Sequence, residues 1–479
     1  MQESRPALLW LRQDLRLADN PALAAAAANG RPVIPLYILD ENGAGDWRPG
    51  GASRWWLHMS LATLATSLAK QGLGLVLRRG PAASVITDMI EATGADAAYW
   101  NRCYEPAAIA RDRDIKRLLR KRGIVAESFN AALLFEPWTI KTGQGTPFKV
   151  FTPFWQALRR ESIPAPTPVP GRLIAPQSAP ASERLEDWNL LPQPDWAAGL
   201  REAWTPGEAG ARRRLAGFIG DALADYREGR DRPGREGTSR LSPHLHWGEI
   251  GPRQVWQAVS MAAGASDTAK ENYLRELGWR EFTHHLLFHW PTLPQEPWRP
   301  EFACFPWRED TAGLAAWQRG RTGYPIVDAG MRELWHTGWM HNRVRMIAAS
   351  FLIKDLLIPW QRGEAWFWDT LVDADLAQNS ASWQWVAGSG ADAAPYFRVF
   401  NPVLQGEKFD PQGDYVRRWV PELAQMPNDY IHKPWLAAPA IREAAGIALG
   451  HDYPAPIVDH GEARDQALAA YRSLKTATD

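Results

Sequence analysis

The sequence predicts an α/β amino-terminal domain with a five-stranded parallel sheet, followed by an all-α carboxy-terminal domain. Three observations support this fold class. The chain has 479 residues, more than one typical hydrophobic core accommodates. Short apolar runs alternate with helical patterns over the first 130 residues, which is typical of a parallel sheet with helices on both faces. Beyond about Ala203 the strand signals stop and long helical patterns follow.

Five apolar runs in the first part are predicted to be buried strands. They cover residues 7–11, 33–39, 73–78, 97–100 and 124–128. Apolar residues at helical spacing predict helices between them, for example over residues 53–70 and 109–121. We therefore assign residues 1–132 to the α/β domain.

A proline-rich stretch separates the two predicted domains. Residues 164–194 contain eight prolines and few periodic apolar positions, a composition typical of an extended connector. We place an interdomain linker at residues 133–202 and the helical domain at residues 203–479. Within that domain, the apolar spacing predicts helices over residues 270–289, 325–337 and 339–357.

The composition excludes several classes of protein. Lys plus Arg and Asp plus Glu both number 54, so an anionic partner has to bind a local patch. Two cysteines, Cys103 and Cys304, are too few for a disulfide framework, a four-cysteine zinc site or an iron–sulfur cluster, and they favour a reducing cytoplasm. No apolar run is long enough for a bilayer span or a secretory signal. The 26 tryptophans, against 15 Phe and 11 Tyr, require a chemical explanation.

Two motifs of the helical domain combine polar groups with aromatic ones. Residues 237–243, GTSRLSP, place three hydroxyl side chains in a turn before a helical segment, and such a turn can bind phosphate, although an ordinary helix cap is the commoner explanation. On the helix after residue 270, one face carries Tyr273, Glu276, Trp279 and Arg280. An exposed ion pair between Glu276 and Arg280 is the alternative here.

Residues 341–346, HNRVRM, place three adaptable side chains on one face of a predicted helix. Asn342, Arg345 and Met346 lie three and four residues apart, whereas Arg343 points to a different side. Asn can contact a base edge and Arg can pair with a buried anion. An ordinary amphipathic helix with a polar face would show the same spacing.

Two carboxylates, Asp373 and Asp375, lie in the segment DADLAQNSASWQW, ahead of Asn379, Trp383 and Trp385. The segment is too rich in small and polar residues to be a core element. A metal site would need more ligands than this segment offers, so we expect no metal.

Together these motifs resemble the flavin-binding domain of DNA photolyases and cryptochromes. The resemblance rests on TGYPIVDAGMREL from Thr322, GWMHNRVRM from Gly338, DADLAQNSASWQW from Asp373 and DAAPYFRVFNPVLQGEKFDPQGDYVRRWVPEL from Asp392. It also includes GTSRLSP, the helix of Glu276 and WLRQDLRLADNPAL from Trp10. The resemblance therefore spans nearly the whole chain, in order.

The resemblance implies a bent FAD in the helical domain. The residues that match its binding positions are Tyr226, Thr238, Ser239, Arg240, Leu241, Ser242, Tyr273, Arg280, Trp339, Asn342, Arg345, Asp373, Ala374, Asp375 and Asn379. Asn379 would face the reactive ring nitrogen, and asparagine there is typical of photolyases, since plant cryptochromes carry an acid and animal ones a cysteine.

The resemblance also assigns an electron-transfer chain to Trp307, Trp360 and Trp383. Indole suits this role because it oxidises readily and packs tightly. Core packing is the alternative for any single tryptophan, and most of the 26 must serve that purpose.

The implied activity is that of a deoxyribodipyrimidine photo-lyase, a carbon–carbon lyase that opens cyclobutane pyrimidine dimers by electron transfer from photoexcited reduced FAD. The lesion has to be flipped out of the duplex, because an enzyme cannot reach a base inside the stack. The residues that match lesion or DNA contacts are Arg230, Glu276, Trp279, Asn342, Arg343, Met346, Trp385 and Arg398, with Glu276 also in a catalytic role. Asn342 and Met346 favour cyclobutane dimers, because the six-four branch carries histidines around this helix.

An antenna chromophore is a further expectation. Tyr104 and Glu105 match the folate site of enterobacterial photolyases, but its Asn-Glu pair falls on Ala107 and Ala108. The surrounding sequence is more similar to bacterial class III photolyases and plant cryptochromes. Class III enzymes bind a folate differently, so we expect methenyltetrahydrofolate in preference to a deazaflavin or a second flavin.

Two other functions fit parts of the sequence. A blue-light photoreceptor of the cryptochrome kind would keep FAD without repairing DNA, and the fold alone does not separate it from a repair enzyme. Three features favour repair. They are Asn379, the presence of the expected lesion residues Glu276, Trp279, Asn342 and Met346, and the end of the chain at Asp479, soon after the family domain. A plain electron-transfer flavoprotein would share the parallel sheet but not the helical domain. We expect a bacterial cytoplasmic monomer that contacts the nucleoid during repair and has no membrane contact.

Overall fold

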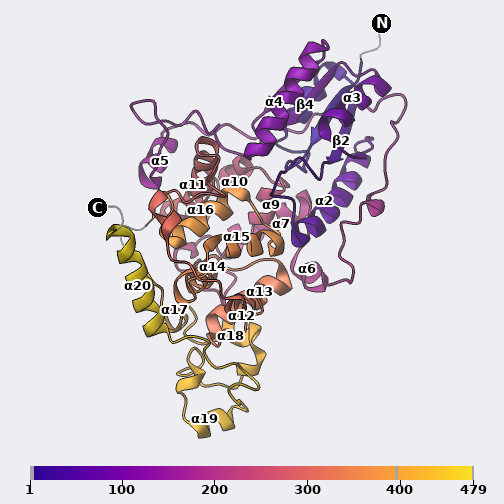
Figure 1. The fold of residues 1–479 in the computed structure, drawn as a ribbon. Helices are drawn as coiled ribbons and strands as arrows, with labels where there is room; N and C mark the ends of the chain where they lie inside the picture. The colour runs from indigo at the N-terminus through magenta and orange to yellow at the C-terminus, as the bar shows by residue number, and fades with distance from the viewer. Residues whose placement is uncertain (1–4, 394–396, 477–479) are drawn as a thin grey trace.

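The computed structural model describes residues 5–393 and 397–476 and confirms the two-part architecture (Figure 1). An α/β unit containing the amino terminus lies at one end, and a larger helical unit forms the rest. Residues 394–396, part of the motif from Asp392, lie outside the described residues.

The sheet has five parallel strands, as the sequence predicts. They are β1 (Ala7–Leu11), β2 (Val33–Leu39), β3 (Val76–Arg79), β4 (Ala97–Asn101) and β5 (Val125–Phe129). Their spatial order is β3-β2-β1-β4-β5. The third strand begins three residues later than residue 73, because pairing with β2 starts at Leu36 opposite Val76.

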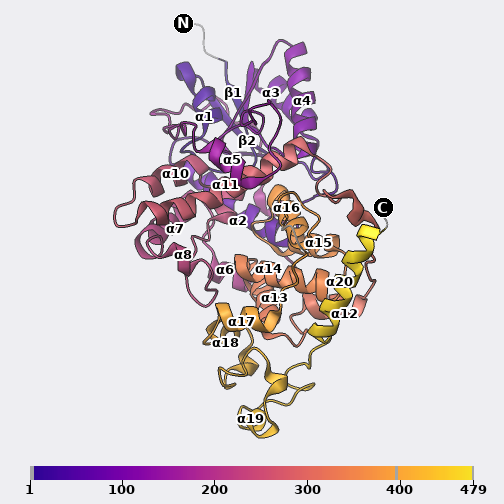
Figure 2. The same ribbon diagram turned by 90° about the vertical axis from the view of Figure 1, so that its left-hand side faces the viewer.

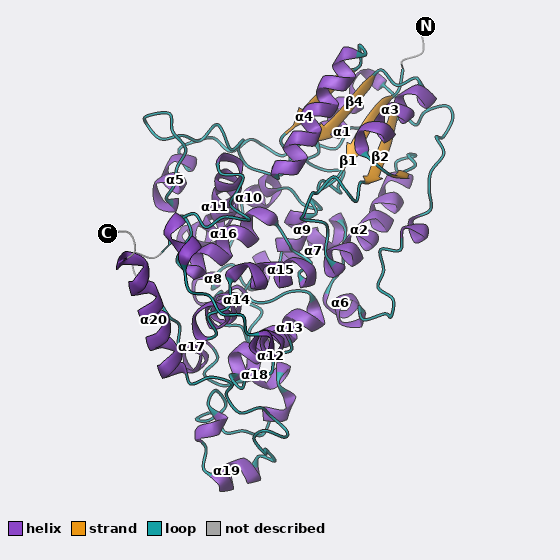
Figure 3. Cartoon of the chain, viewed as in Figure 1, coloured by secondary structure: helices purple, strands orange, loops and turns teal. Residues whose placement is uncertain are grey.

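Both faces of the sheet are buried under helices (Figure 3). The helices of this unit are α1 (Pro21–Ala26), α2 (Gly51–Ala69), α3 (Ala82–Thr93) and α4 (Pro106–Lys121). Successive residues of a strand point to opposite faces. Leu9 of β1 therefore packs with α1 and α2, while Leu8 and Trp10 pack with α3 and α4.

The predicted linker contains a packed helix ahead of its proline-rich stretch. Helix α5 (Phe151–Leu158) lies within it, and its aromatic side chains join the core around α11. Gly278 of α11 permits this contact, because a Cβ atom there would lie 2.4 Å from the Trp155 ring. Residues 164–194, predicted to be extended, contain no α-helix but include a 3-10 turn at Leu185–Trp188. They bond to the α/β unit, for example through Val33 N–H and the Ile174 carbonyl at 2.8 Å. The domain boundaries after residues 132 and 202 remain predictions.

The helical unit is built from many short and medium helices. They are α6 (Ala198–Ala203), α7 (Glu208–Asp221), α8 (Tyr226–Gly229), α9 (Ser242–His246), α10 (Pro252–Ser260), α11 (Asp267–His289), α12 (Thr311–Gln318), α13 (Pro325–Thr337), α14 (Asn342–Ser350), α15 (Trp360–Thr370), α16 (Leu376–Ala387), α17 (Pro402–Phe409), α18 (Asp414–Trp419), α19 (Pro439–Ala444) and α20 (His460–Thr476). No helix in the described part of the chain is both long and apolar enough to cross a membrane.

The helix predicted over residues 339–357 is interrupted in the structure. Helix α14 begins only at Asn342, where the His341 ring accepts a hydrogen bond from Arg343 N–H and caps the helix. It passes into a π-helical turn, Phe351–Asp355, which is followed by Leu357 at φ +55°. The apolar pattern continues through the break, because apolar residues on both sides of it, such as Ile347, Leu352 and Ile358, are buried in the same core.

Candidate active site

The predicted site residues come from segments far apart in sequence that meet in the middle of the helical unit. Helix α11 packs against α8 and α16, and α14 also packs against α16. Figure 2 shows α11, α14 and α16 between the sheet and the end of the molecule formed by α17, α18 and α19.

The GTSRLSP turn is tied to its surroundings by its hydroxyl groups. Tyr273 O–H lies 3.0 Å from Ser239 Oγ, and the Trp339 indole N–H donates to Ser242 Oγ at 3.2 Å. Neither serine caps α9, which has no side-chain cap, so the helix-cap explanation is wrong. Arg240 adopts the left-handed region at φ +49°, and its guanidinium lies 4.5 Å from the Trp339 ring centroid. The turn is thus held in a defined, strained shape.

The two aspartates of the DADLAQNSASWQW segment are both held by cationic or ring-nitrogen donors. Arg345 Nη2 contacts the two Asp373 oxygens at 3.1 and 2.8 Å. Asp375 Oδ2 lies 3.4 Å from His284 Nε2 and 3.8 Å from His246 Nδ1. Burial would raise the pKa of Asp375, but the two histidines and Arg280 outweigh it and hold that pKa well below its usual value. Asp375 is therefore ionised at neutral pH.

Asn379 is oriented by a buried glutamate on the neighbouring helix α15. Its Nδ2 donates to the Glu364 carbonyl at 3.1 Å, and Ser380 Oγ donates to Glu364 Oε1 at 2.6 Å. Burial raises the pKa of Glu364 to about 8, and the Ser380 hydrogen bond offsets only part of that shift. At neutral pH, Glu364 mostly holds its proton; its carboxyl group contacts Ser380, and its backbone carbonyl holds Asn379.

The predicted lesion residues on α11 have partners that spacing did not reveal. Glu276 accepts a hydrogen bond from Arg230, so the surface pair between Glu276 and Arg280 is wrong. Trp279 stacks on Phe151 of α5, with ring centroids 3.6 Å apart and an 8° angle between the rings. One face of this indole is thus already covered. Arg280 instead donates to the Ala132 carbonyl at 2.6 Å.

The remaining candidates for lesion or DNA contact each have local partners of their own. Arg343 binds Asp231 at 2.8 Å, on a different side from Arg345 as predicted, yet its Nη1 also lies 3.7 Å from the Met346 sulfur. The Trp385 indole donates to the Asp392 carbonyl at 3.1 Å. Arg398 contacts Phe400, with its guanidinium 4.9 Å from the ring centroid, and its carbonyl accepts from Lys354.

The three predicted electron-transfer tryptophans occupy different environments. Trp360 and Trp383 are buried in the main helical core, while Trp307 is partly buried and packs beside Phe305 with centroids 4.3 Å apart. The Trp383 ring packs directly on the backbone at Gly363, where a Cβ atom would lie 2.1 Å from it. Many other tryptophans are fully buried core residues, as expected from their number.

Comparison with known proteins identifies the family. One family model, described as DNA photolyase, matches residues 7–171, and a second, the FAD binding domain of DNA photolyase, matches residues 273–473. A deoxyribodipyrimidine photo-lyase from Agrobacterium fabrum is 54% identical over 481 residues, which cover 99% of both chains. The chain belongs to the DNA photolyase family.

Two further members of the photolyase and cryptochrome group are similar. Cryptochrome-1 of Arabidopsis thaliana is 40% identical over 491 residues, covering 98% of this chain and 71% of the cryptochrome. The crystal structure of a bacterial class III photolyase from Agrobacterium tumefaciens matches with a TM-score of 0.96 and 52% identity, covering 99% of each chain. The fold predicted from the sequence resemblance is thereby confirmed.

The polar groups of the site fit the FAD that a photolyase-family domain binds. A pyrophosphate needs several N–H and O–H donors. Within residues 5–393 and 397–476, the buried Nε atoms of Arg240 and Arg280 have no hydrogen-bond partner, and both arginines belong to the predicted set. Gly237 packs so closely on the backbone of Gly229 that a Cβ atom would lie 2.4 Å from the Gly229 carbonyl oxygen, so the start of the turn needs a glycine. The individual FAD contacts stay predictions.

Three residues of the site were missed by sequence reasoning. Glu364 orients Asn379, and His246 and His284 hold Asp375. Glu364 was detectable as a lone acid within the aromatic segment WQRGEAWFW. The histidines carried no signal, because their spacing to Asp375 exists only after α9, α11 and α16 pack together.

The protonated Glu364 predicts a pH-dependent stability. Its folded-state pKa of about 8 exceeds the ordinary 4.5, so the folded protein binds more protons than the unfolded chain between these values. The contribution is complete below pH 4.5 and is lost as pH rises towards 8, at up to about 1.4 kcal/mol per pH unit. Glu364→Gln should remove this loss. The Tm of the variant relative to the unsubstituted protein should rise steadily from pH 5 to pH 8; a constant difference would contradict a protonated Glu364.

Proposed function

We propose that the protein repairs cyclobutane pyrimidine dimers in DNA with light, using reduced FAD bound in the helical domain. The observation that carries the proposal is the convergence of three groups in one place. The strained GTSRLSP turn supplies phosphate donors, Asn379 is held by the Glu364 carbonyl, and Glu276 of α11 pairs with Arg230, the residue that follows α8. The 54% identity to a photo-lyase supports the same activity.

The residues divide the work in this proposal. Bound FAD supplies the photoexcited electron that opens the cyclobutane ring and accepts it back. Arg345 fixes the position of Asp373, and the two histidines fix the position of Asp375 and hold its pKa low. Glu276 and Asn342 hydrogen-bond the polar edge of the flipped lesion, while Trp279, Met346 and Trp385 provide its apolar walls.

Local arginines allow a neutral protein to bind DNA. Arg230, Arg343 and Arg398 would contact phosphates, which makes binding dependent on salt but not on sequence. Arg230 and Arg343 currently pair with Glu276 and Asp231, so DNA phosphates would compete with those carboxylates. We propose that the protein acts as a monomer on the bacterial nucleoid, with both cysteines reduced.

A folate antenna is favoured over a second flavin. In open parallel sheets, ligands bind at the carboxyl ends of the strands where the strand order reverses, here between β1 and β4. That crevice is filled by buried side chains. Arg12 binds Asp112 at 3.0 Å and lies 4.1 Å from the Trp10 ring centroid, while Asn101 donates to Asp14 at 2.6 Å. We therefore place methenyltetrahydrofolate elsewhere in the α/β unit.

A repair assay tests the proposed function. Purified protein with reduced FAD is illuminated in the presence of an oligonucleotide carrying one cyclobutane thymine dimer, and lesion loss is compared with a dark control. We expect light-dependent loss of the dimer and no loss in the dark. A protein that binds and photoreduces FAD normally but leaves the dimer intact would be a photoreceptor of the cryptochrome kind instead.

A further inference from the structure

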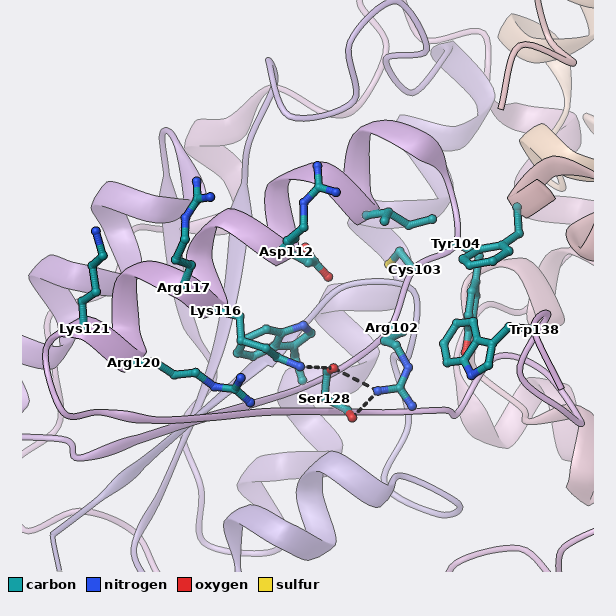
Figure 4. Close-up of a pocket in the computed structure, with 14 residues that line it drawn as sticks. Arg102, Cys103, Tyr104, Asp112, Lys116, Arg117, Arg120, Lys121, Ser128 and Trp138 are labelled. Atoms are coloured by element: carbon teal, nitrogen blue, oxygen red, sulfur yellow. Dashed lines mark hydrogen bonds between the residues drawn. The ribbon is translucent and has the colours of Figure 1, made fainter. Parts of the chain in front are cut away.

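Lys354 is buried inside the helical unit, although the ammonium group of a lysine usually stays in water. It lies in the π-helical turn that follows α14 and is 3% exposed. Lys116 of α4 offers a comparison, because it is only half-buried and its Nζ donates to Ser128 Oγ at 2.8 Å (Figure 4). A fully buried ammonium needs a partner inside the protein, so the surroundings of Lys354 indicate its role.

The partner of Lys354 is a backbone carbonyl that is distant in sequence. Its Nζ donates a hydrogen bond to the Arg398 carbonyl and lies 4.5 Å from the centroid of the Phe397 ring. Asp355, the carboxylate next to Lys354 in sequence, contacts His460 of α20 at 2.6 Å instead. The ammonium therefore acts on the backbone at Arg398, through a charge-assisted hydrogen bond.

Residues 397–400 hold one exposed arginine between two buried aromatic side chains. Phe397 and Phe400 are buried, whereas Arg398 is exposed. The Phe397 ring stacks on Tyr471 of α20, with ring centroids 4.7 Å apart and a 9° angle between the rings. The backbone is thus anchored while the guanidinium remains accessible to a ligand in solution.

The same segment is tied to α14, the helix that carries several of the predicted lesion residues. Phe400 N–H donates to Ser350 Oγ, at the end of α14, at 3.3 Å. The π-helical turn that contains Lys354 continues directly from this helix, and such turns are frequent at functional sites. The serine and the ammonium together set the position of the Arg398 backbone relative to the lesion residues of α14.

We propose that Lys354 is a positioning residue for DNA binding: its ammonium holds the Arg398 carbonyl and so places the Arg398 guanidinium against a DNA phosphate beside the flipped lesion. The proposal rests on the repair function and the phosphate contact proposed above, and it adds the residue that fixes this contact. A guanidinium on an ordered backbone loses less conformational freedom when it binds, so the contact becomes stronger.

This positioning should depend on pH. Burial lowers the pKa of Lys354 to about 7, Asp355 offsets part of the shift, and the Arg398 guanidinium adds to it. His460 of α20 faces Asp355 and not the ammonium. Lys354 is therefore mostly charged at pH 6 and mostly neutral at pH 8.5. A neutral amine is the weaker donor, so the hold on the Arg398 carbonyl should weaken as pH rises through 7.

Binding of damaged DNA by the whole protein with FAD tests the proposal. Dissociation constants for a duplex with one cyclobutane thymine dimer are measured in the dark at pH 6 over a range of salt concentrations. Lys354→Met should weaken binding about fivefold and reduce the salt slope by about 0.9, the value for one phosphate contact. Arg398→Gln should have the same two effects. Lys354→Met should add nothing in the Arg398→Gln background, because both substitutions remove one contact.

A pH series gives a second measurement, which uses the unsubstituted protein. Its affinity for the damaged duplex should fall between pH 6 and pH 8.5 and approach that of Lys354→Met, which should lack this component. Lys116→Met is the matched control, because burial also lowers the pKa of Lys116 but its partner is Ser128 in the α/β unit. This variant should keep the affinity, the salt slope and the fall with pH of the unsubstituted protein.

Three results would overturn the proposal. The first is additive losses of affinity for Lys354→Met and Arg398→Gln. The second is a Lys354→Met variant with a lower Tm but an unchanged salt slope and pH profile, which would leave Lys354 a purely structural residue. The third is an unchanged salt slope in Arg398→Gln. Light-dependent dimer loss is measured on the same preparations, so failure of this positioning role with intact repair is distinguishable from failure of the proposed function.

Discussion

Replacing Trp383 with phenylalanine should reduce the photoreduction of bound FAD by at least about a hundredfold while sparing repair by chemically pre-reduced protein. An indole oxidises readily and a phenyl ring does not, so the electron supply to the flavin would stop. Repair itself draws its electron from already reduced FAD. Bleaching of oxidised flavin under blue light measures photoreduction, and dimer loss after chemical reduction measures repair.

The control for Trp383→Phe is Trp188→Phe, which truncates a buried tryptophan of the linker that packs into the core beside the sheet. Both substitutions leave a cavity that costs about 1–3 kcal/mol of stability. The control should lose stability without losing photoreduction. If Trp383→Phe abolished repair by pre-reduced protein as well, the assignment of Trp383 to electron supply alone would be wrong.

Replacing Glu276 with alanine should lower dimer repair at least about tenfold while FAD stays bound. The carboxylate lies at the predicted lesion edge and fixes Arg230, so its removal costs both a lesion hydrogen bond and the position of a phosphate contact. The repair rate at saturating light is measured and divided by the amount of bound FAD, which is determined from the flavin absorbance. Glu276→Gln should keep a hydrogen bond without the charge. Its repair rate should therefore lie between those of the unsubstituted protein and Glu276→Ala.

Glu271→Ala is the matched control, because Glu271 lies on the same helix and pairs with Arg159 at the exposed surface. It should leave repair and FAD content unchanged. An equal loss of repair in both variants would indicate a general disturbance of α11. Loss of FAD in Glu276→Ala would place Glu276 in cofactor binding instead of lesion recognition.

Several parts of the molecule were predictable because their cause is local. Short continuous apolar runs placed the five strands, and regular apolar spacing placed α13 at Pro325–Thr337. Long ordered motifs were sufficient to recognise the family. The proline-rich residues 164–194 form no α-helix for a similarly local reason, since proline restricts its own backbone.

Other contacts could not be predicted because the deciding partner is distant in sequence. Spacing on α11 left a pair of Glu276 with Arg280 open as an alternative, but the partner of Glu276 is Arg230, 46 residues away on the neighbouring segment. The linker contains α5 because its aromatic face finds a core only where Gly278 leaves room on α11. The break after α14 is equally invisible in an apolar pattern that continues through it.

The sequence by itself determined the strand and helix pattern, the family and the set of residues expected at the flavin and the lesion. Only the tertiary structure decided which polar groups meet: the Glu364 carbonyl with Asn379, and the two histidines with Asp375. The reason is that backbone periodicity is set within a few residues, whereas the partner of a buried polar side chain is chosen by how separate elements pack.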